Sequence, residues 1–477
     1  MPAPTLAAAD VDVLRKGVSG DVIRPGDAAY DEARLLWNGA FDRRPAVVVR
    51  CLSAQDVSAA VTFARMHGLE LAVRGGGHST GGLSGVDDGL VIDLSAMNQV
   101  ETDVEGRRCR VGGGATLGQR DGATQEHGLA TTAGIVGHTG VGGLTLTGGM
   151  GWLTRKHGLA LDNVLAVQIV TADGKIRRAS ADEEPDLYWA VRGGGGNFGV
   201  VTEFEFQLHP VGPMVDFGLL FWPITQALDV LRLARRLFAS MSTETNIIVA
   251  GINAPPEPFV PAEHHGTPGI ALVIAGFGGD GEHGQVLDQI NAELPPLFQL
   301  TMPMPYAGLQ QMFDEANRFG LLAYDKATYV EDLSDDVAAV IADQLARKQS
   351  PQSAFFIYRL DGAYSEVGDD DTAFGGGRSP RYAVFLLAIA EEPALLATDT
   401  EWARGFWDAL QSVSMGRGSY LNGESEYPED RVRASFGPEK YARLAALKAR
   451  YDPDNVFHRN ANIPPALQPP QQRTPGD

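Results

Sequence analysis

The chain has 477 residues, which is too long for one hydrophobic core and predicts two domains. Its formal net charge of −21, from 39 basic and 60 acidic side chains, repels phosphate backbones and anionic lipid, so we expect neither nucleic acid nor membranes as partners. Only two cysteines, Cys51 and Cys109, occur, which excludes a disulfide scaffold and favours a reducing compartment. Residues 1–10 lack a secretory-signal pattern and no apolar stretch is long enough to span a membrane, so a cytoplasmic protein is expected.

The first predicted elements lead to a glycine-rich loop. Residues 53–56 resemble a capping box, and the apolar positions after them predict a helix that ends at Gly68. Residues 69–73 alternate as a short strand that delivers the loop. Further strands are predicted at residues 91–94 and 109–111.

A hairpin is predicted over residues 164–179, because apolar residues alternate there before an Asp-Gly turn signal at 173–174. A short helix follows over residues 185–189, and residues 200–208 alternate again as a strand. Short strands, hairpins and interspersed helices favour an α+β fold over a doubly wound parallel sheet.

The composition changes after residue 210, where glycine clusters thin out and proline-rich loops separate longer apolar segments. We therefore predict one domain over residues 1–210 and a second over residues 211–415. Apolar residues at helical spacing predict a helix over residues 438–451, which the following Asp-Pro pair ends. The Pro- and Gln-rich tail, residues 466–477, is predicted to be disordered.

Two glycine-rich runs carry the strongest chemical signal. Gly75, Gly76 and Gly77 lead directly to His78, and a second run covers residues 140–151. Glycines leave backbone N–H groups unshielded by a Cβ atom, which suits a phosphate-bearing cofactor. Phosphate loops use lysine, serine or threonine, so the histidine indicates a cofactor that is also attacked by a nucleophile. Alternatively, the histidine is a polar turn residue and the glycines serve only tight packing.

Motifs of several other enzyme classes do not fit. Residues 194–199 satisfy G-x-G-x-x-G, but a predicted helix precedes them and a strand follows, the reverse of the order in a nicotinamide site. The sequence has no Walker lysine motif, H-E-x-x-H, C-x-x-C or G-x-S-x-G elbow. The ten histidines show no metal-ligand spacing, so no metal is expected.

Five stretches together match one known family in order: residues 73–79, 140–152, 189–202, 420–422 and 451–463. Through them the chain resembles the covalent flavoprotein oxidoreductases with a PCMH-type FAD-binding domain, specifically the berberine-bridge-enzyme-like group. The stretches bracket nearly the whole chain. Similarity around residues 137–140 points to the bacterial members that tailor natural products.

The resemblance implies a division of the chain. Residues from about 35 to 210, together with residues 416–465, would form the FAD-binding domain, built from two α+β subdomains. Residues 211–415 would form a substrate-binding domain, an antiparallel sheet backed by helices that roofs the flavin ring. The active site is expected between the two domains.

The resemblance also implies FAD attached covalently through His78, whose imidazole attacks the 8α-methyl carbon of the flavin. Many relatives carry a second tether, a cysteine at the position of Val136, so a single bond is predicted here. The other implied cofactor contacts are Arg74, Gly75, Gly76, Gly77, Ser79, Val136, Gly137, His138, Gly140, Gly143, Gly149, Gly199, Val201, Asn422, Asn460 and Asn462.

Two residues are candidates for catalysis by the same resemblance. Thr139 matches the position that gates oxygen access to the reduced flavin, and its small size favours an oxidase. Tyr420 matches a tyrosine on the substrate side, where it could act as a base if its pKa, ordinarily about 10, were lowered or if the transfer were concerted. Glu424 and Glu426 are alternative proton acceptors. The substrate pocket candidates are Tyr358, Tyr364 and Arg378.

These features predict an FAD-dependent oxidase. It would take a hydride from a C–H bond at an alcohol or related group of a natural product or sugar, and O₂ would regenerate the flavin with release of H₂O₂. The expected partners are a small-molecule substrate and O₂. Alternatives are a flavin-dependent oxygenase of a polyketide-like substrate and an oxygen-inert dehydrogenase. A flavin-binding protein without turnover fits least, because residues 420–422 are present where chemistry is expected.

Overall fold

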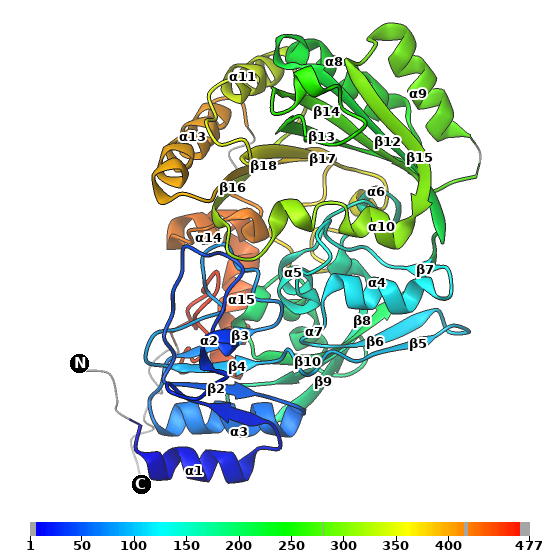
Figure 1. Cartoon of the computed structure of the whole chain (residues 1–477). Helices are drawn as coiled ribbons and strands as arrows, with labels where there is room; N and C mark the ends of the chain where they lie inside the picture. The colour runs from blue at the N-terminus through cyan, green and yellow to red at the C-terminus, as the bar shows by residue number, and fades with distance from the viewer. Residues whose placement is uncertain (1–5, 280, 415–417, 468–477) are drawn as a thin grey trace.

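The structure, a computed structural model, describes residues 6–279, 281–414 and 418–467. It has two stacked halves: a large antiparallel sheet with its helices forms the upper half of Figure 1, and a four-stranded sheet, a five-stranded sheet and a short two-stranded sheet belong to the rest of the molecule. The chain begins in the lower half, builds the upper half and then returns to the lower half (Figure 1). The predicted α+β fold is confirmed.

The first lower sheet and its helices comprise α1 (Ala8–Gly17), β1 (Asp21–Ile23), α2 (Tyr30–Ala33), β2 (Val47–Arg50), α3 (Ala54–Met66), β3 (Leu71–Arg74) and β4 (Leu90–Asp93). Its strand order is β1-β2-β4-β3, with β4 parallel to both of its neighbours. The Ser53 side chain accepts the Asp56 N–H at the start of α3, which confirms the predicted cap. Helices α1 and α3 lie beneath this sheet (Figure 1).

The second lower sheet belongs to the segment with β5 (Val100–Asp103), β6 (Arg108–Gly112), α4 (Leu117–Gln125), β7 (Leu129–Ala130), α5 (Val141–Thr147), α6 (Thr154–His157), β8 (Val164–Val170), β9 (Ile176–Ser180), α7 (Pro185–Val191), β10 (Val200–Gln207) and β11 (His209–Pro210). Five strands pair antiparallel in the order β5-β6-β10-β8-β9, and β7 pairs separately with β11. The predicted hairpin is confirmed as β8 and β9. Helix α7 precedes the G-x-G-x-x-G stretch at residues 194–199 and strand β10 follows it, which is the predicted order.

The upper half comprises β12 (Met214–Pro223), α8 (Ala227–Ser240), β13 (Thr245–Asn253), β14 (Pro268–Gly276), α9 (Glu282–Glu293), β15 (Phe298–Pro305), α10 (Tyr306–Gln311), β16 (Leu322–Val330), α11 (Asp335–Leu345), β17 (Ala354–Leu360), α12 (Ala363–Glu366), β18 (Arg381–Ala390) and α13 (Pro393–Gln411). Its seven strands are antiparallel in the order β15-β12-β14-β13-β17-β18-β16.

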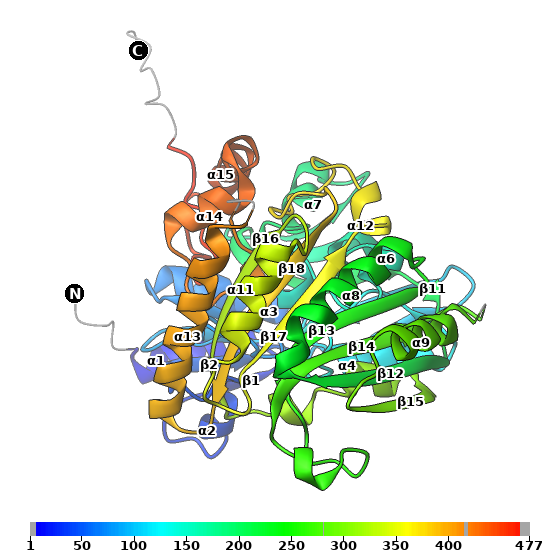
Figure 2. The ribbon, with the colours of Figure 1, turned by 90° about the horizontal axis from the view of Figure 1, so that it is seen from above.

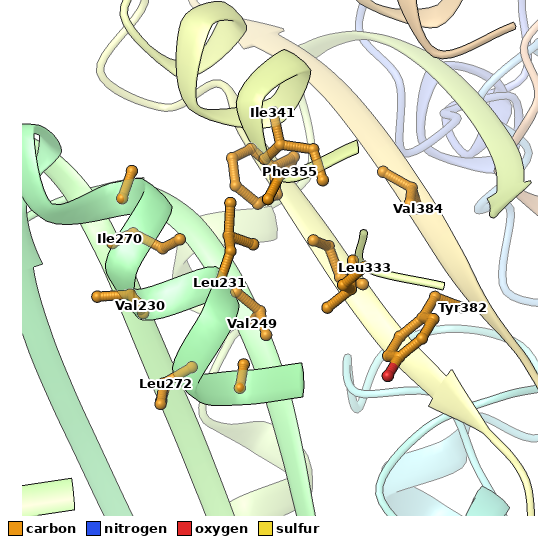
Figure 3. Packing of buried hydrophobic residues seen from close by; sticks show 14 of the residues in the cluster. Val230, Leu231, Val249, Ile270, Leu272, Leu333, Ile341, Phe355, Tyr382 and Val384 are labelled. Atoms are coloured by element: carbon orange, nitrogen blue, oxygen red, sulfur yellow. The ribbon is translucent and has the colours of Figure 1, made fainter. Parts of the chain in front are cut away.

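Helices α8, α9, α11 and α13 cover the outer face of this sheet, as the view from above shows (Figure 2). Leu231 of α8 and Ile341 of α11 pack with Val249, Phe355 and Val384 of the sheet (Figure 3). Burial of each such side chain stabilises the fold by about 1.5–3 kcal/mol. The inner face of the same strands is therefore left to face the lower half.

The returning segment forms α14 (Glu429–Phe436) and α15 (Pro438–Tyr451) in the lower half. Tyr441 and Leu444 of α15 pack in one cluster with Trp189 and Phe198. The helix ends at Tyr451, as predicted. Short 3-10 helices lie at Ala160–Asn163, Gly195–Asn197, Ile224–Gln226, Ala262–His264, Glu315–Asn317 and Leu421–Gly423.

The strands of the large sheet lie between Met214 and Ala390. The exact domain boundaries at 210/211 and 415/416 stay predictions. Most of the tail predicted to be disordered, residues 468–477, lies outside the described residues. Among the helices that the structure describes, none is both long and apolar enough to cross a membrane.

Candidate active site

A cavity of about 410 Å³ is lined by residues of both halves, and we call it the junction cavity. The loops after β3 and before α5, strand β10, the inner faces of β16, β17 and β18, and the C-terminal segment all contribute to its wall. The predicted site residues that line it are Gly75, Gly76, Gly77, His78, Ser79, Val136, Thr139, Gly140, Gly143, Gly199, Val201, Tyr358, Tyr420, Asn422 and Asn460. Segments far apart in the sequence therefore meet at one site.

Two glycine loops meet backbone to backbone at the cavity wall. A Cβ atom on Gly76 would lie 2.3 Å from the Gly140 nitrogen, and one on Gly140 would lie 2.4 Å from the Gly76 nitrogen. Neither distance is possible for a real side chain, so this approach requires glycine at both positions. A Cβ on Gly143 would meet no atom within 4 Å, so this stretch of backbone is open to a ligand.

His78 projects from the first glycine loop into a group of aromatic rings. Its ring stacks on Trp37 with a centroid separation of 4.9 Å and meets the edge of Phe319. Burial, with a smaller contribution from neighbouring His138, lowers the pKa of His78 from 6.5 to about 3. The imidazole is therefore neutral at physiological pH, the form in which it is a nucleophile.

The hydrogen-bond chain behind His78 determines which ring nitrogen is free. His78 Nε2 lies 2.6 Å from His138 Nδ1, and His138 Nε2 lies 3.3 Å from the Asp314 carbonyl oxygen. A carbonyl oxygen only accepts, so His138 Nε2 carries the hydrogen, and in neutral His138 the Nδ1 accepts from His78 Nε2–H. This assignment leaves a lone pair on His78 Nδ1, which no described residue engages.

Tyr420 is held from two sides at its phenol oxygen. The Gly149 N–H donates to it at 2.8 Å and Asn422 Nδ2 donates at 3.1 Å. Burial nevertheless raises the pKa of Tyr420 above its ordinary value of 10, and these two hydrogen bonds only reduce the shift. The condition of a lowered pKa is therefore not met for Tyr420, and its role as a base in a concerted transfer stays a prediction.

The two glutamates considered as alternative proton acceptors do not line the cavity. Glu424 is buried, with Oε2 at 3.2 Å from Lys326 Nζ and 3.1 Å from an Arg431 guanidinium nitrogen. Glu426 is paired with Arg404 on the outer side. Both carboxylates are occupied by cations, so neither is free to accept a proton from a ligand in the cavity.

Two of the three predicted substrate-pocket residues are corrected by the structure. Arg378 does not line the junction cavity, because its guanidinium makes a bidentate ion pair with Asp162 at 2.7 and 2.8 Å. Tyr364 donates its hydroxyl to the Gly377 carbonyl oxygen and also lies away from the cavity. Tyr358 does line it, on the inner face of β17.

Five predicted cofactor contacts lie behind the cavity wall instead of on it: Arg74, Gly137, His138, Gly149 and Asn462. Arg74 forms an ion pair with Asp93 that anchors the end of β3. The Gly137 N–H donates to Asp314 at 2.6 Å, which fixes the loop that carries His138. Arg74 and Gly137 thus stabilise the loops that form the cavity wall.

Sequence reasoning missed Asp325, which lies on β16 and lines the junction cavity. Thr80 Oγ1 donates to its Oδ2 at 2.8 Å, while its buried Oδ1 has no partner among the described residues. Burial, reinforced by nearby Glu424, raises the pKa of Asp325 from 3.8 to about 7, although the Thr80 bond opposes this. The available signal was a charged pair, Asp325 and Lys326, inside an otherwise apolar strand.

The polar atoms of the wall fit a long cofactor with many hydrogen-bonding groups. Arg459 Nε and Asn460 Oδ1 are buried without a partner in the described part of the chain, and both residues line the cavity. Buried polar atoms without partners are costly, so a bound group would satisfy them. Together with the open glycine backbone and the neutral imidazole, they define a site for FAD in an oxidoreductase with an α+β FAD-binding domain.

Comparisons with known proteins agree with this class. The FAD binding domain family matches residues 45–180, and the family described as berberine and berberine like matches residues 419–464. The (R)-6-hydroxynicotine oxidase of Paenarthrobacter nicotinovorans is 33% identical over 466 residues, which cover 94% of this chain and 97% of that protein. The chain belongs to the berberine-bridge-enzyme-like family of FAD-dependent oxidoreductases.

Solved structures extend the similarity to the whole fold. The 6-hydroxy-D-nicotine oxidase of Arthrobacter nicotinovorans superposes with a TM-score of 0.82 at 30% identity and covers 94% of this chain and 98% of that chain. The BBE-like 1 protein of Physcomitrella patens gives a TM-score of 0.85 at 24% identity, with 96% and 99% covered, which shows the same fold.

Proposed function

We propose that this protein is a cytoplasmic oxidase that carries FAD on a single covalent bond to His78. The observation that carries the proposal is the neutral His78 ring with a free Nδ1 lone pair at the wall of the junction cavity. Val136 lines the same cavity and offers no thiol for a second bond. The two cysteines, Cys51 and Cys109, are buried and lie outside the cavity wall.

The chain's own residues divide the work at this site. The flavin, when bound, accepts a hydride from the substrate and passes the electrons to O₂, with release of H₂O₂. The glycine loops at Gly76 and Gly140 would hold it by backbone, and Asn460 would donate or accept hydrogen bonds along it. Thr139 lines the cavity and is small enough to leave room for O₂, which supports an oxidase over a dehydrogenase.

The roof of the cavity supports a substrate with a substantial apolar surface. Tyr358 and Phe385 present aromatic rings from β17 and β18, with ring centroids 5.3 Å apart. Aromatic walls with few polar groups suit a small aromatic or aliphatic natural product better than a long oligosaccharide, which needs many hydrogen-bond partners. We infer that the oxidised group is an alcohol or amine carbon, in line with the nicotine oxidase relative.

A mass measurement on the purified protein tests the tether. The denatured wild-type chain is expected to retain yellow colour and to exceed its sequence mass by one FAD less the two hydrogens lost on bonding. H78A is expected to lose all covalent flavin, whereas the control H127A, which changes an exposed histidine, keeps it. Colourless denatured wild-type protein would overturn the covalent proposal.

A second experiment tests the oxidase assignment. A panel of alcohols and amines is screened anaerobically for bleaching of the flavin, and the reduced protein is then mixed with air. We expect rapid reoxidation with one H₂O₂ formed for each substrate oxidised. Slow reoxidation in air would identify a dehydrogenase, and oxygen incorporation into the product would identify an oxygenase.

A further inference from the structure

The junction cavity holds very few groups able to exchange a proton. Among the described residues that line it, Asp325 is the only carboxylate. The phenols of Tyr358, Tyr420 and Tyr427 also line it, and burial raises the pKa of each above 10. Since a base must be deprotonated before it accepts a proton, these phenols are poorly suited to that role near neutral pH.

His78 and Arg459, the other titratable side chains that the structure describes at the cavity wall, are also unsuited to act as the base. In the proposed function, His78 Nδ1 forms the covalent bond to the flavin, and His78 Nε2 is hydrogen-bonded to His138. Arg459 is a permanent cation with no acceptor to offer. Asp325 therefore remains as the group that gains and loses a proton in the ordinary range of pH.

Hydrogen bonds to Ser425 and Thr80 fix the position of Asp325. Its N–H donates to Ser425 Oγ at 2.8 Å, and its carbonyl oxygen accepts the Ser425 N–H at 3.1 Å. Thr80 Oγ1 holds one carboxylate oxygen at 2.8 Å, which leaves Oδ1 as the buried atom without a partner. Asp325 is thus anchored at one carboxylate oxygen, and its other oxygen keeps an unused hydrogen-bond acceptor at a residue that lines the cavity.

The charged groups around Asp325 do not neutralise it. Lys326 is its neighbour in sequence, but alternation along β16 turns Lys326 to the outer face, where it pairs with Glu424 at 3.2 Å. Glu424 raises the pKa of Asp325 from the C-terminal side, and Tyr427 packs nearby as a neutral phenol. No cation contacts the carboxylate among the described residues, so it keeps its basicity.

We propose that Asp325 is the catalytic base that removes the O–H or N–H proton of the substrate while hydride leaves the adjacent carbon. This inference rests on the proposed oxidase function. The substrate O–H or N–H bond breaks, its proton forms the O–H of the Asp325 carboxylic acid, and its electron pair becomes the second bond of a C=O or C=N group. The two electrons of the hydride go to the flavin and then to O₂, and Asp325 releases its proton to solvent before the next turnover. The substrate therefore carries a hydroxyl or amine on the carbon that is oxidised.

Anaerobic flavin reduction by a substrate from the screen tests the role of Asp325. The wild-type rate is expected to fall about tenfold for each pH unit below an inflection near the pKa of the carboxyl. D325N is expected to reduce its flavin about 10²–10⁴-fold more slowly, without that inflection. D332N, which changes a half-exposed aspartate paired with Arg235 on the outer face, is the matched control and should behave as the wild type.

Thr80→Val provides a variant that keeps the carboxylate. The Thr80 hydrogen bond lowers the pKa of Asp325, so its removal is expected to move the inflection to higher pH. Infrared spectra of the resting protein give a readout without turnover. A band of a protonated carboxyl should disappear between about pH 6 and about pH 8 in the wild type and show no such change in D325N.

The outcomes separate this proposal from the proposed function. A D325N rate within about twofold of wild type, or an inflection unmoved in T80V, would overturn the role of Asp325 and leave the oxidase intact. If no alcohol or amine bleaches the wild-type flavin, the oxidase proposal fails and the role of Asp325 fails with it. Covalent flavin content, measured on each denatured variant, confirms that the variants compared are folded and loaded.

Discussion

Replacement of Asp325 by asparagine should change how stability depends on pH, independently of catalysis. The carboxyl has a pKa of about 7 in the folded protein and 3.8 when unperturbed. The folded state thus holds a proton that the unfolded chain has already released, and wild-type stability falls as pH rises from about 4 to about 7. A pKa difference of about three, at about 1.4 kcal/mol for each pKa unit, amounts to about 4 kcal/mol.

Asparagine cannot ionise, so D325N escapes this loss. Its unfolding free energy, measured relative to wild type, should increase by about 4 kcal/mol between about pH 4 and about pH 8 and then stay constant. Chemical denaturation of both holoproteins, followed by far-UV circular dichroism across this range, gives the difference directly. Two parallel curves across the range would show that Asp325 is ionised like an exposed carboxylate, and they would refute the reasoning from its burial.

Two further predictions concern the cavity wall and the thiols. Gly140→Ala should destabilise the protein by about 1–3 kcal/mol and reduce its flavin content, because the new Cβ would lie 2.4 Å from the Gly76 nitrogen. Gly122→Ala, whose Cβ would lie in open space on α4, is the control. Equal melting temperatures of Gly140→Ala and the wild type would contradict the prediction. Burial raises the pKa of Cys109 to about 11 and that of Cys51 further. Neither thiol should therefore react with a thiol reagent at about pH 8 until the protein is denatured. Rapid labelling of the native protein would disprove this prediction.

The sequence predicted the parts of the fold that depend on neighbouring residues. The Ser53 cap, the hairpin of β8 and β9, and the end of α15 at Tyr451 all follow from signals within a few positions. The glycine loop before His78 was predicted for the same reason, since the short strand β3 delivers it. Such local preferences survive in the folded protein because tertiary packing agrees with them.

The partners of buried charges could not be predicted in this way. Arg378 was expected in the substrate pocket, but it pairs with Asp162, which is 216 positions away in sequence. Asp325 was overlooked because nothing near it in sequence shows that Thr80, 245 positions away, holds one of its oxygens. Pattern and spacing describe the local chain, whereas these contacts depend on how the two halves are stacked.

The alternation of β17 and β18 has a consequence for how this enzyme could change over evolution. Tyr358 and Phe385 face the cavity, whereas their immediate neighbours Ile357 and Leu386 belong to the helix-covered core. Selection for a new substrate therefore acts on one set of positions and selection for foldability on the other. A mutant library confined to the cavity-facing set should sample altered specificities while most of its members still fold.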